Sequence, residues 1–146
     1  MKYLLAVVAA LVFASCSPFG LNVAGYSDKA ESLDSAWAKT ASYTYIPEGH
    51  AHWKSPKQFE ADGGGECEDF SGHLLYSLGE GEAVTVAFYQ NGERFGHCII
   101  RYHGKYIEPQ CYGEYIDIEK RGWVIVDEYS WQEVMATITQ HGTRKI

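Results

Sequence analysis

One cysteine of the chain stands where a protein can activate a thiol for attack on a carbonyl group. Cys67 comes shortly after a glycine-rich stretch (63–65) that lets other backbone approach closely. It lies at the start of a segment, Glu66 to Leu78, with apolar residues at helical spacing. The unpaired N–H groups at the start of a helix stabilise a thiolate. Acidic neighbours oppose ionisation, so we expect a histidine to supply positive charge and to hold the thiol pKa well below about 8.5.

Two tight turns predict the strands that bring a histidine to this cysteine. Asn91-Gly92 is a strong hairpin signal, and His103-Gly104 predicts a second turn. We expect antiparallel strands over about 94–102 and 105–111. If His103 and Gly104 are the two loop residues, residue 102 pairs with residue 105, and the rest of the register follows.

That register places His97 and Glu108 on one face of the sheet, diagonally across two neighbouring strands. Such a diagonal is about 7–8 Å between backbones, which long side chains can bridge with a hydrogen bond. A cysteine nucleophile needs a base that moves its proton and a group that holds the base in one tautomer. We therefore predict a triad of Cys67, His97 and Glu108, with Asp117 or Glu119 as fallback acids.

The same register bears on Cys98 and Cys111, which it places on the face opposite to His97. The two cysteines would be diagonal rather than directly opposed, and a disulfide usually needs Cα atoms within about 6.8 Å. A shift of the turn by one residue would oppose them squarely but would move Glu108 away from His97. We favour the register of the triad, with Cys98 and Cys111 as buried thiols or a strained pair.

The remaining pattern predicts an α+β fold. A capping-box pattern at Asp28 and Glu31 predicts a first helix that begins at Asp28, and Ser130 with Glu133 predicts a short closing helix. The order helix, helix, antiparallel strands, helix is that of an α+β domain. Further strands are expected at 84–88, 116–118 and 123–127.

The chain contains Trp53-Lys54-Ser55-Pro56 and, after a short spacer, Gly64-Gly65-Glu66-Cys67-Glu68-Asp69-Phe70-Ser71. These segments resemble the nucleophile region of the bacterial transglutaminase-like cysteine proteinases. Their pattern is Trp-x-[ST]-Pro, a spacer, and Gly-Gly-Asp-Cys-Glu-Asp-Tyr-Ala at the start of a helix. The Gly-His-Cys stretch at 96–98 and the acid at 108 fall where that family has its histidine and its aspartate. The resemblance covers under half of the chain.

The resemblance implies a papain-like, transglutaminase-like core, in which a nucleophile helix packs on an antiparallel sheet that carries the histidine and the acid. It implies Cys67 as the nucleophile, His97 as the general base and acid, and Glu108 as the orienting acid. The chain departs from the family at 66 and 108, where aspartate is usual, and it is shorter than typical proteases of the family.

The resemblance also bears on calcium and on the oxyanion hole. Some members are calcium-dependent periplasmic proteases that use acids beside the cysteine, and Glu66 and Asp69 match those positions. No cofactor is required by the chemistry, and a Ca²⁺ role stays open, although Ca²⁺ usually takes about 6–8 oxygen ligands. An oxyanion hole needs the Cys67 backbone N–H and one more donor, for which Trp53 and Gln58 are the candidates.

The first residues predict export. Lys2 and the apolar run Leu4–Phe13 have the pattern of a signal peptide, and the run is shorter than the about 20 residues of a membrane-spanning helix. Phe13-Ala14-Ser15-Cys16 resembles a lipobox, in which the cysteine becomes the lipidated first residue. Ordinary secretion with cleavage near Ser15 is the alternative. We expect a lipoprotein-type signal peptide at 1–15, a tether at 16–27, and a transglutaminase-like cysteine peptidase domain at 28–146.

Composition narrows the partners. The 146 residues are 46% hydrophobic and 21% charged, as in a folded domain, and the net charge of −7 with no basic stripe argues against a nucleic-acid partner. We expect a protein or peptide substrate and a lipid anchor in the periplasmic side of the envelope through Cys16. Three functions stay open: an envelope peptidase or amidase that forms a thioester, acyl transfer by the same triad, and a non-catalytic binding protein on this fold.

Overall fold

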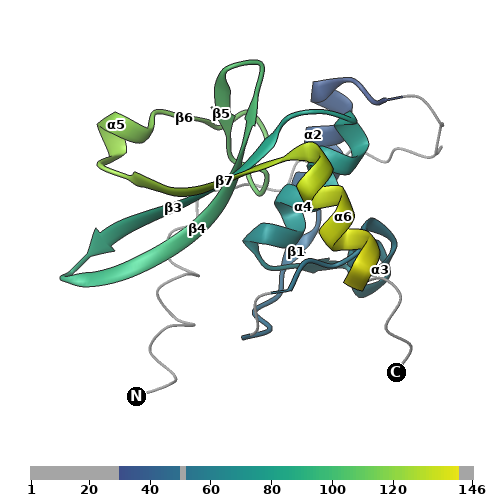
Figure 1. Ribbon diagram of the computed structural model, residues 1–146, viewed down its shortest axis with the longest axis horizontal. Coiled ribbons are helices and arrows are strands. Elements are labelled where there is room, and N and C mark those ends of the chain that lie inside the picture. The colour runs from purple at the N-terminus through teal and green to yellow at the C-terminus, as the bar shows by residue number, and fades with distance from the viewer. Residues whose placement is uncertain (1–29, 50–51, 142–146) are drawn as a thin grey trace.

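The computed structural model describes residues 30–49 and 52–141 (Figure 1). The predicted signal peptide, the tether and the lipidation site Cys16 lie outside the described residues. In the described part, helices and an antiparallel sheet form an α+β fold, as predicted. None of the helices described there is both long and apolar enough to cross a membrane.

Five antiparallel strands form the main sheet, in the order β6-β5-β4-β3-β7. Both predicted turns close hairpins, and Asn91 and His103 take the positive φ values (52° and 47°) that such two-residue turns require. Tyr102 pairs with Lys105, so the predicted register is confirmed. The strands are β3 (Glu82–Gln90), β4 (Glu93–Tyr102), β5 (Lys105–Ile107), β6 (Tyr115–Ile116) and β7 (Val124–Ser130).

The helix that begins with the candidate nucleophile, α4 (Cys67–Leu78), packs on β4 and among the other long helices. Figure 1 shows α2, α3, α4 and α6 gathered beside the sheet, with α5 away from them. Leu74 and Leu75 of α4 are fully buried, and Gly79 ends the helix in the left-handed conformation, with φ of 74°. The other helices are α2 (Leu33–Ala41), α3 (Pro56–Asp62), α5 (Ile118–Arg121) and α6 (Trp131–His141).

A small parallel sheet fixes the chain just before α4. Its two strands are β1 (Thr44–Tyr45) and β2 (Gly64–Gly65). Gly64 has a φ of 146°, and a side chain there would collide with the carbonyl oxygen of Thr44. A side chain at Gly65 would collide with Asp69. The glycine-rich stretch therefore serves the close approach of backbone that its composition predicts.

The sheet carries a hydrophobic cluster on each face. On the helical face, Cys98 and Ile100 of β4 pack with residues of α2, α4 and α6. On the other face, Val84, Val86 and Ile99 pack with residues around β6 and α5. Successive side chains of β3 and β4 thus enter the two clusters in turn, and both faces of these strands are buried. Strand β4, which carries His97, is therefore held rigidly between two layers.

The predicted start of the first helix is wrong. Residues 30–32 are not helical, and α2 begins at Leu33. Ser32 is the N-cap, because its side chain accepts a hydrogen bond from the N–H of Ser35 (3.4 Å). Glu31 is instead tied to the end of α4 through a hydrogen bond from its N–H to the carbonyl oxygen of Ser77 (3.0 Å).

Three further elements differ from those predicted from the sequence. The helix α3, with Pro56 at its first position, was not predicted. The strand expected over 105–111 ends at Ile107, because the chain turns directly after it and its N–H groups bond within that turn. At Ile118 a short helix begins where the strand was expected to continue.

Candidate active site

Acidic side chains hold the start of α4 by accepting backbone N–H groups. Asp69 accepts from the N–H of Glu66 at Oδ2 (3.0 Å) and from the N–H of Lys54 at Oδ1 (2.7 Å). Oε1 of Glu66 accepts from the N–H groups of residues 48 and 49 (3.0 and 3.3 Å). These bonds fix the preceding loop against the helix and leave Cys67 at its first position.

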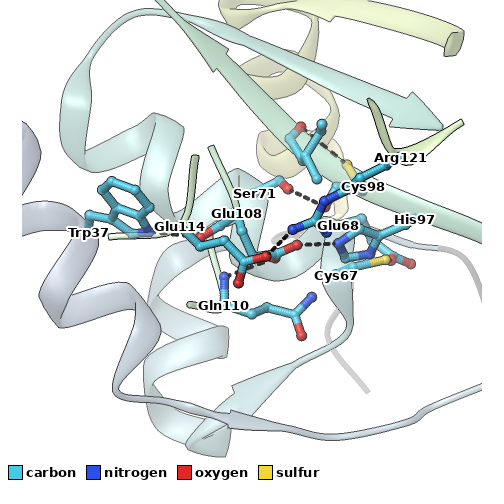
Figure 2. A network of polar contacts seen from close by, with 11 residues as sticks. Trp37, Cys67, Glu68, Ser71, His97, Cys98, Glu108, Gln110, Glu114 and Arg121 are labelled. Carbon is cyan, nitrogen blue, oxygen red and sulfur yellow. Dashed lines mark hydrogen bonds and ion pairs between the residues drawn. The ribbon is translucent and has the colours of Figure 1, made fainter. Parts of the chain in front are cut away.

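The strand β4 and the segment after β5 bring His97 and Glu108 into direct contact (Figure 2). Nε2 of His97 lies 2.7 Å from Oε2 of Glu108, and both side chains are almost fully buried. Glu108 is itself held, because its Oε1 accepts from the N–H of Gln110 (3.2 Å) and its carbonyl oxygen accepts from the indole N–H of Trp37 (2.8 Å). The contacts with His97, Gln110 and Trp37 therefore hold Glu108 in one orientation.

The Cys67 thiol completes the line, because it hydrogen-bonds with His97. Glu108 engages Nε2 of the imidazole, so Nδ1 is the ring nitrogen left for the thiol. The ring of Trp123 meets the His97 ring edge-on, with centroids 5.9 Å apart, and restricts its rotation. The structure thus brings together all three residues predicted for the triad.

Burial and charge act in opposite directions on the pKa of His97. Burial lowers this pKa, whereas the Glu108 carboxylate and the hydrogen bond with Cys67 raise it, and the net result is a pKa of about 10. A charged His97 is therefore the resting state at neutral pH.

The thiol pKa moves opposite to the expectation from sequence. Burial raises the pKa of Cys67 to about 11, against the lowering effect of His97. Charge on the neighbouring Glu68 adds to the rise. Desolvation of a buried thiolate therefore outweighs the helix start and the histidine, and the resting protein holds a protonated thiol beside an imidazolium.

Two side chains next to the thiol were not predicted as part of the site. The thiol of Cys67 donates to Oε2 of Glu68 (3.3 Å), and burial raises the pKa of that carboxyl. Burial and then the charge of Cys67 raise the pKa of Tyr45, on β1, to about 12. The pairing of Tyr45 with Gly65 explains how β1 approaches the nucleophile, and only the fold reveals it.

The two oxyanion candidates are placed differently. Trp53 is half-buried, packs against Gly72 of α4 and meets Tyr129 edge-on (6.4 Å), so it belongs to the core on the helical face. Gln58 is exposed on α3, and its amide donates to Asp62 (2.5 Å). The structure does not bring the Gln58 amide to the thiol.

A buried ammonium group lies beside the start of α4. Nζ of Lys54 pairs with Glu48 and with Asp62 (2.9 Å), and it donates to the carbonyl oxygen of Gly64 (3.2 Å). The Lys54 side chain is 4% exposed. A monovalent cation supplied by the chain therefore already fills an oxygen-lined position here.

The two acids that the resemblance offered as Ca²⁺ ligands, Glu66 and Asp69, do not fit a Ca²⁺ site. Both oxygens of Asp69 and one oxygen of Glu66 are engaged by backbone N–H groups. Among residues 30–49 and 52–141, no three His, Cys, Asp or Glu side chains form a group that could hold a metal ion. We derive no step of the chemistry through calcium.

Cys98 is a free and buried thiol, so the strained pair with Cys111 does not form. This outcome agrees with the register that favours the triad. The prediction of a buried free thiol is wrong for Cys111, which is disulfide-bonded and only partly buried. The fallback acids Asp117 and Glu119 are both exposed, at the cap and in the first turn of α5. Glu108 is therefore the acid that the structure places on His97.

The described part of the chain has a transglutaminase-like α+β fold, as predicted. Two structures of LapG from Legionella pneumophila are similar: the calcium-bound form has a TM-score of 0.54 and 18% sequence identity, and the EGTA-treated form has 0.50 and 20%. The likeness covers 66% of this chain but only 62% and 61% of the LapG chains, less than two thirds of their length. No family model and no curated protein matches the chain. At this identity, the likeness establishes the fold.

Proposed function

We propose that the chain is a cysteine peptidase or amidase of the bacterial cell envelope that acts through a thioester acyl-enzyme at Cys67. The observation that carries the proposal is the buried line from Cys67 through His97 to Glu108. The sequence resemblance around Cys67 supports it. So does the likeness in fold to LapG, a transglutaminase-like cysteine protease, which favours a peptidase-like function at the family level.

The resting charges set the order of the steps. Because His97 already carries its proton, the Cys67 thiol first releases its own proton to solvent. The thiolate, paired with the charged His97, then attacks the carbonyl carbon of the substrate, and the C=O electrons move onto the oxygen. His97 then gives its proton to the leaving amine as the C–N bond breaks, which leaves a thioester on Cys67. Neutral His97 next takes a proton from water, whose oxygen attacks the thioester and releases the acid. Glu108 holds the ring throughout and stabilises its charged form.

The edge of the sheet supports a polypeptide as the substrate. In the described part of the chain β7 is the last strand of the sheet, and it begins directly after Trp123, which contacts His97. Val124 and Val126 of this strand are 65% and 48% exposed. An exposed edge strand presents backbone groups to which an extended polypeptide can add.

The proposal places the protein on the periplasmic side of a membrane, anchored through a lipid on Cys16. Its support is the lipobox-like stretch that ends at Cys16 and the apolar run before it. Membrane fractionation of cells that express the wild type or Cys16→Ser tests this point. We expect the wild type in the detergent-soluble membrane fraction and the variant in the soluble fraction. Equal membrane association of both would contradict a lipid anchor.

One observation favours the rival reading of a non-catalytic binding protein. Burial and Glu68 keep the Cys67 thiol protonated, with a pKa of about 11. A protonated thiol suits a cysteine without catalytic function as well as a nucleophile that is inactive at rest. Acyl transfer to an amine is a further variant of the proposal, because the same triad supports it. Both alternatives are outcomes of the experiment below.

The test compares the purified wild type with Cys67→Ser and His97→Ala on a proteome-derived peptide library, with and without a fluorescent primary amine. New peptide termini, identified by mass spectrometry, are expected with the wild type and absent with Cys67→Ser. Incorporation of the amine instead of new termini would assign acyl transfer. Identical libraries after treatment with wild type and Cys67→Ser would contradict the enzymatic proposal and favour the non-catalytic binding protein.

A further inference from the structure

A buried amide beside the triad has no acceptor in the described protein. Gln110 is only 8% exposed, and its Nε2 is the one buried side-chain nitrogen or oxygen without a hydrogen-bond partner in the described part of the chain. Most buried polar groups in native proteins are paired, since an unpaired one loses its bonds to water without replacement. An orphaned donor at this place therefore points to a missing acceptor.

The backbone of Gln110 ties this amide to the catalytic acid. Its N–H donates to Oε1 of Glu108 (3.2 Å), and the next residue, Cys111, donates its N–H to the carbonyl oxygen of Glu108 (3.2 Å). Figure 2 shows the Gln110 side chain extending past Glu108, with its amide end directed toward the side of Cys67 and His97. The backbone from which the amide extends is therefore fixed relative to the acid.

We propose that the Gln110 amide donates a hydrogen bond to the carbonyl oxygen of an acyl substrate at Cys67, and so is the side-chain donor of the oxyanion hole. This assignment rests on the proposed function. The other donor is the backbone N–H of Cys67, which lies at the first position of α4, where N–H groups have no partner within the helix. Gln58, the candidate from sequence, is instead bound to Asp62.

The chemistry explains why such a donor stays unpaired in the free protein. When the thiolate attacks, the C–S bond forms, and the carbonyl electrons move onto the oxygen as negative charge. A preorganised donor that pairs only with this oxygen stabilises the transition state more than the free protein. The ligand class is therefore an acyl group with an electrophilic carbonyl, as in an amide, an ester or a thioester.

Two reagents separate this role from thiol activation. p-Nitrophenyl acetate acetylates a thiolate through an oxyanion and releases p-nitrophenolate, whereas iodoacetamide alkylates it by displacement of iodide, with no oxyanion at the attacked carbon. We would measure both rates at Cys67 by site-resolved mass spectrometry in the wild type, in Gln110→Met and in Gln132→Met. Gln132 is an exposed residue of α6 and serves as the matched control.

The expected result is that Gln110→Met lowers acetylation by roughly 10²-fold and leaves alkylation unchanged, while Gln132→Met changes neither. Because the substitution removes an unpaired polar group, its Tm should equal or exceed that of the wild type. Equal acetylation, a parallel fall of both rates, or a lowered Tm would overturn the assignment. A wild-type Cys67 that reacts with neither reagent would instead overturn the proposed function, and this assignment with it.

Discussion

Replacement of Glu108 by glutamine should turn the charged ring of His97 into a neutral ring with its proton on Nδ1. In the wild type, Oε2 of Glu108 faces Nε2 of His97, and Oε1 accepts from the N–H of Gln110. The glutamine of Glu108→Gln has only one oxygen, and the N–H of Gln110 requires it. The new NH₂ group then faces Nε2 of His97, which must accept, so Nε2 gives up its proton and the one ring proton that remains is on Nδ1, facing Cys67.

Two consequences follow for His97. Its pKa should fall, because the carboxylate is the charge that raises this pKa to about 10 against the effect of burial. A neutral ring with its proton on Nδ1 can neither give that proton to the leaving amine nor take one from water on the side of Cys67. In a serine protease triad, the corresponding loss of the correct tautomer lowers kcat by about 10⁴-fold. That figure is an upper bound here, since a thiol ionises more readily than a hydroxyl.

The assay is ¹⁵N NMR of the imidazole nitrogens across pH, together with the rate of any Cys67-dependent cleavage. In the wild type we expect a charged ring at pH 8. In Glu108→Gln we expect a neutral ring with its proton on Nδ1, and cleavage reduced toward the level of His97→Ala. The matched control is Glu119→Gln, an exposed carboxylate on α5. A ring in Glu108→Gln that stays charged at pH 8 would refute this reasoning.

Three further predictions concern the groups that support the site. Lys54→Met leaves Glu48 and Asp62 facing each other without a cation. Because both carboxylates are partly exposed, we expect the free energy of unfolding in urea to fall by about 2–3 kcal/mol. The exposed control Lys57→Met should change it little. The wild-type Tm should be the same in CaCl₂ and in EGTA, so a calcium-dependent rise would contradict the fit of Lys54 in place of a metal. Burial lowers the pKa of His73, so its contribution to stability is present above its unfolded pKa of about 6.5 and is lost as pH falls through the folded pKa. The difference in unfolding free energy between wild type and His73→Gln should shrink from pH 8 to pH 5, and a constant difference would show that His73 does not titrate in this way.

The register of the triad strands was predictable because it depends on local chemistry. Asn91-Gly92 and His103-Gly104 allow the positive φ values of two-residue turns, and a turn fixes which residues oppose each other along the whole hairpin. That register brings Ile107 opposite Ile100 and so predicts Glu108 beside His97, although Glu108 itself follows the last residue of β5. The missed helix α3 also has a local signal, a serine N-cap followed by Pro56 at the first helical position.

The electrostatics of the site could not be predicted from the sequence, because they depend on packing between distant segments. The pKa of Cys67 reflects how completely β1, α4 and β4 exclude water, which no residue spacing reports. Lys54 meets partners from a loop, from α3 and from β2. The orphaned amide of Gln110 is visible only as the absence of an acceptor in the described fold.

The most direct test of the central claim is the rate of iodoacetamide alkylation at Cys67, measured from about pH 6 to about pH 11 in wild type and His97→Ala. His97 is the group that lowers the thiol pKa against burial. The wild type should therefore react faster than the variant at every pH below the thiol pKa, and its rate should rise at lower pH than that of the variant. Superimposable profiles would show that His97 does not act on the thiol, and would contradict a catalytic triad at Cys67.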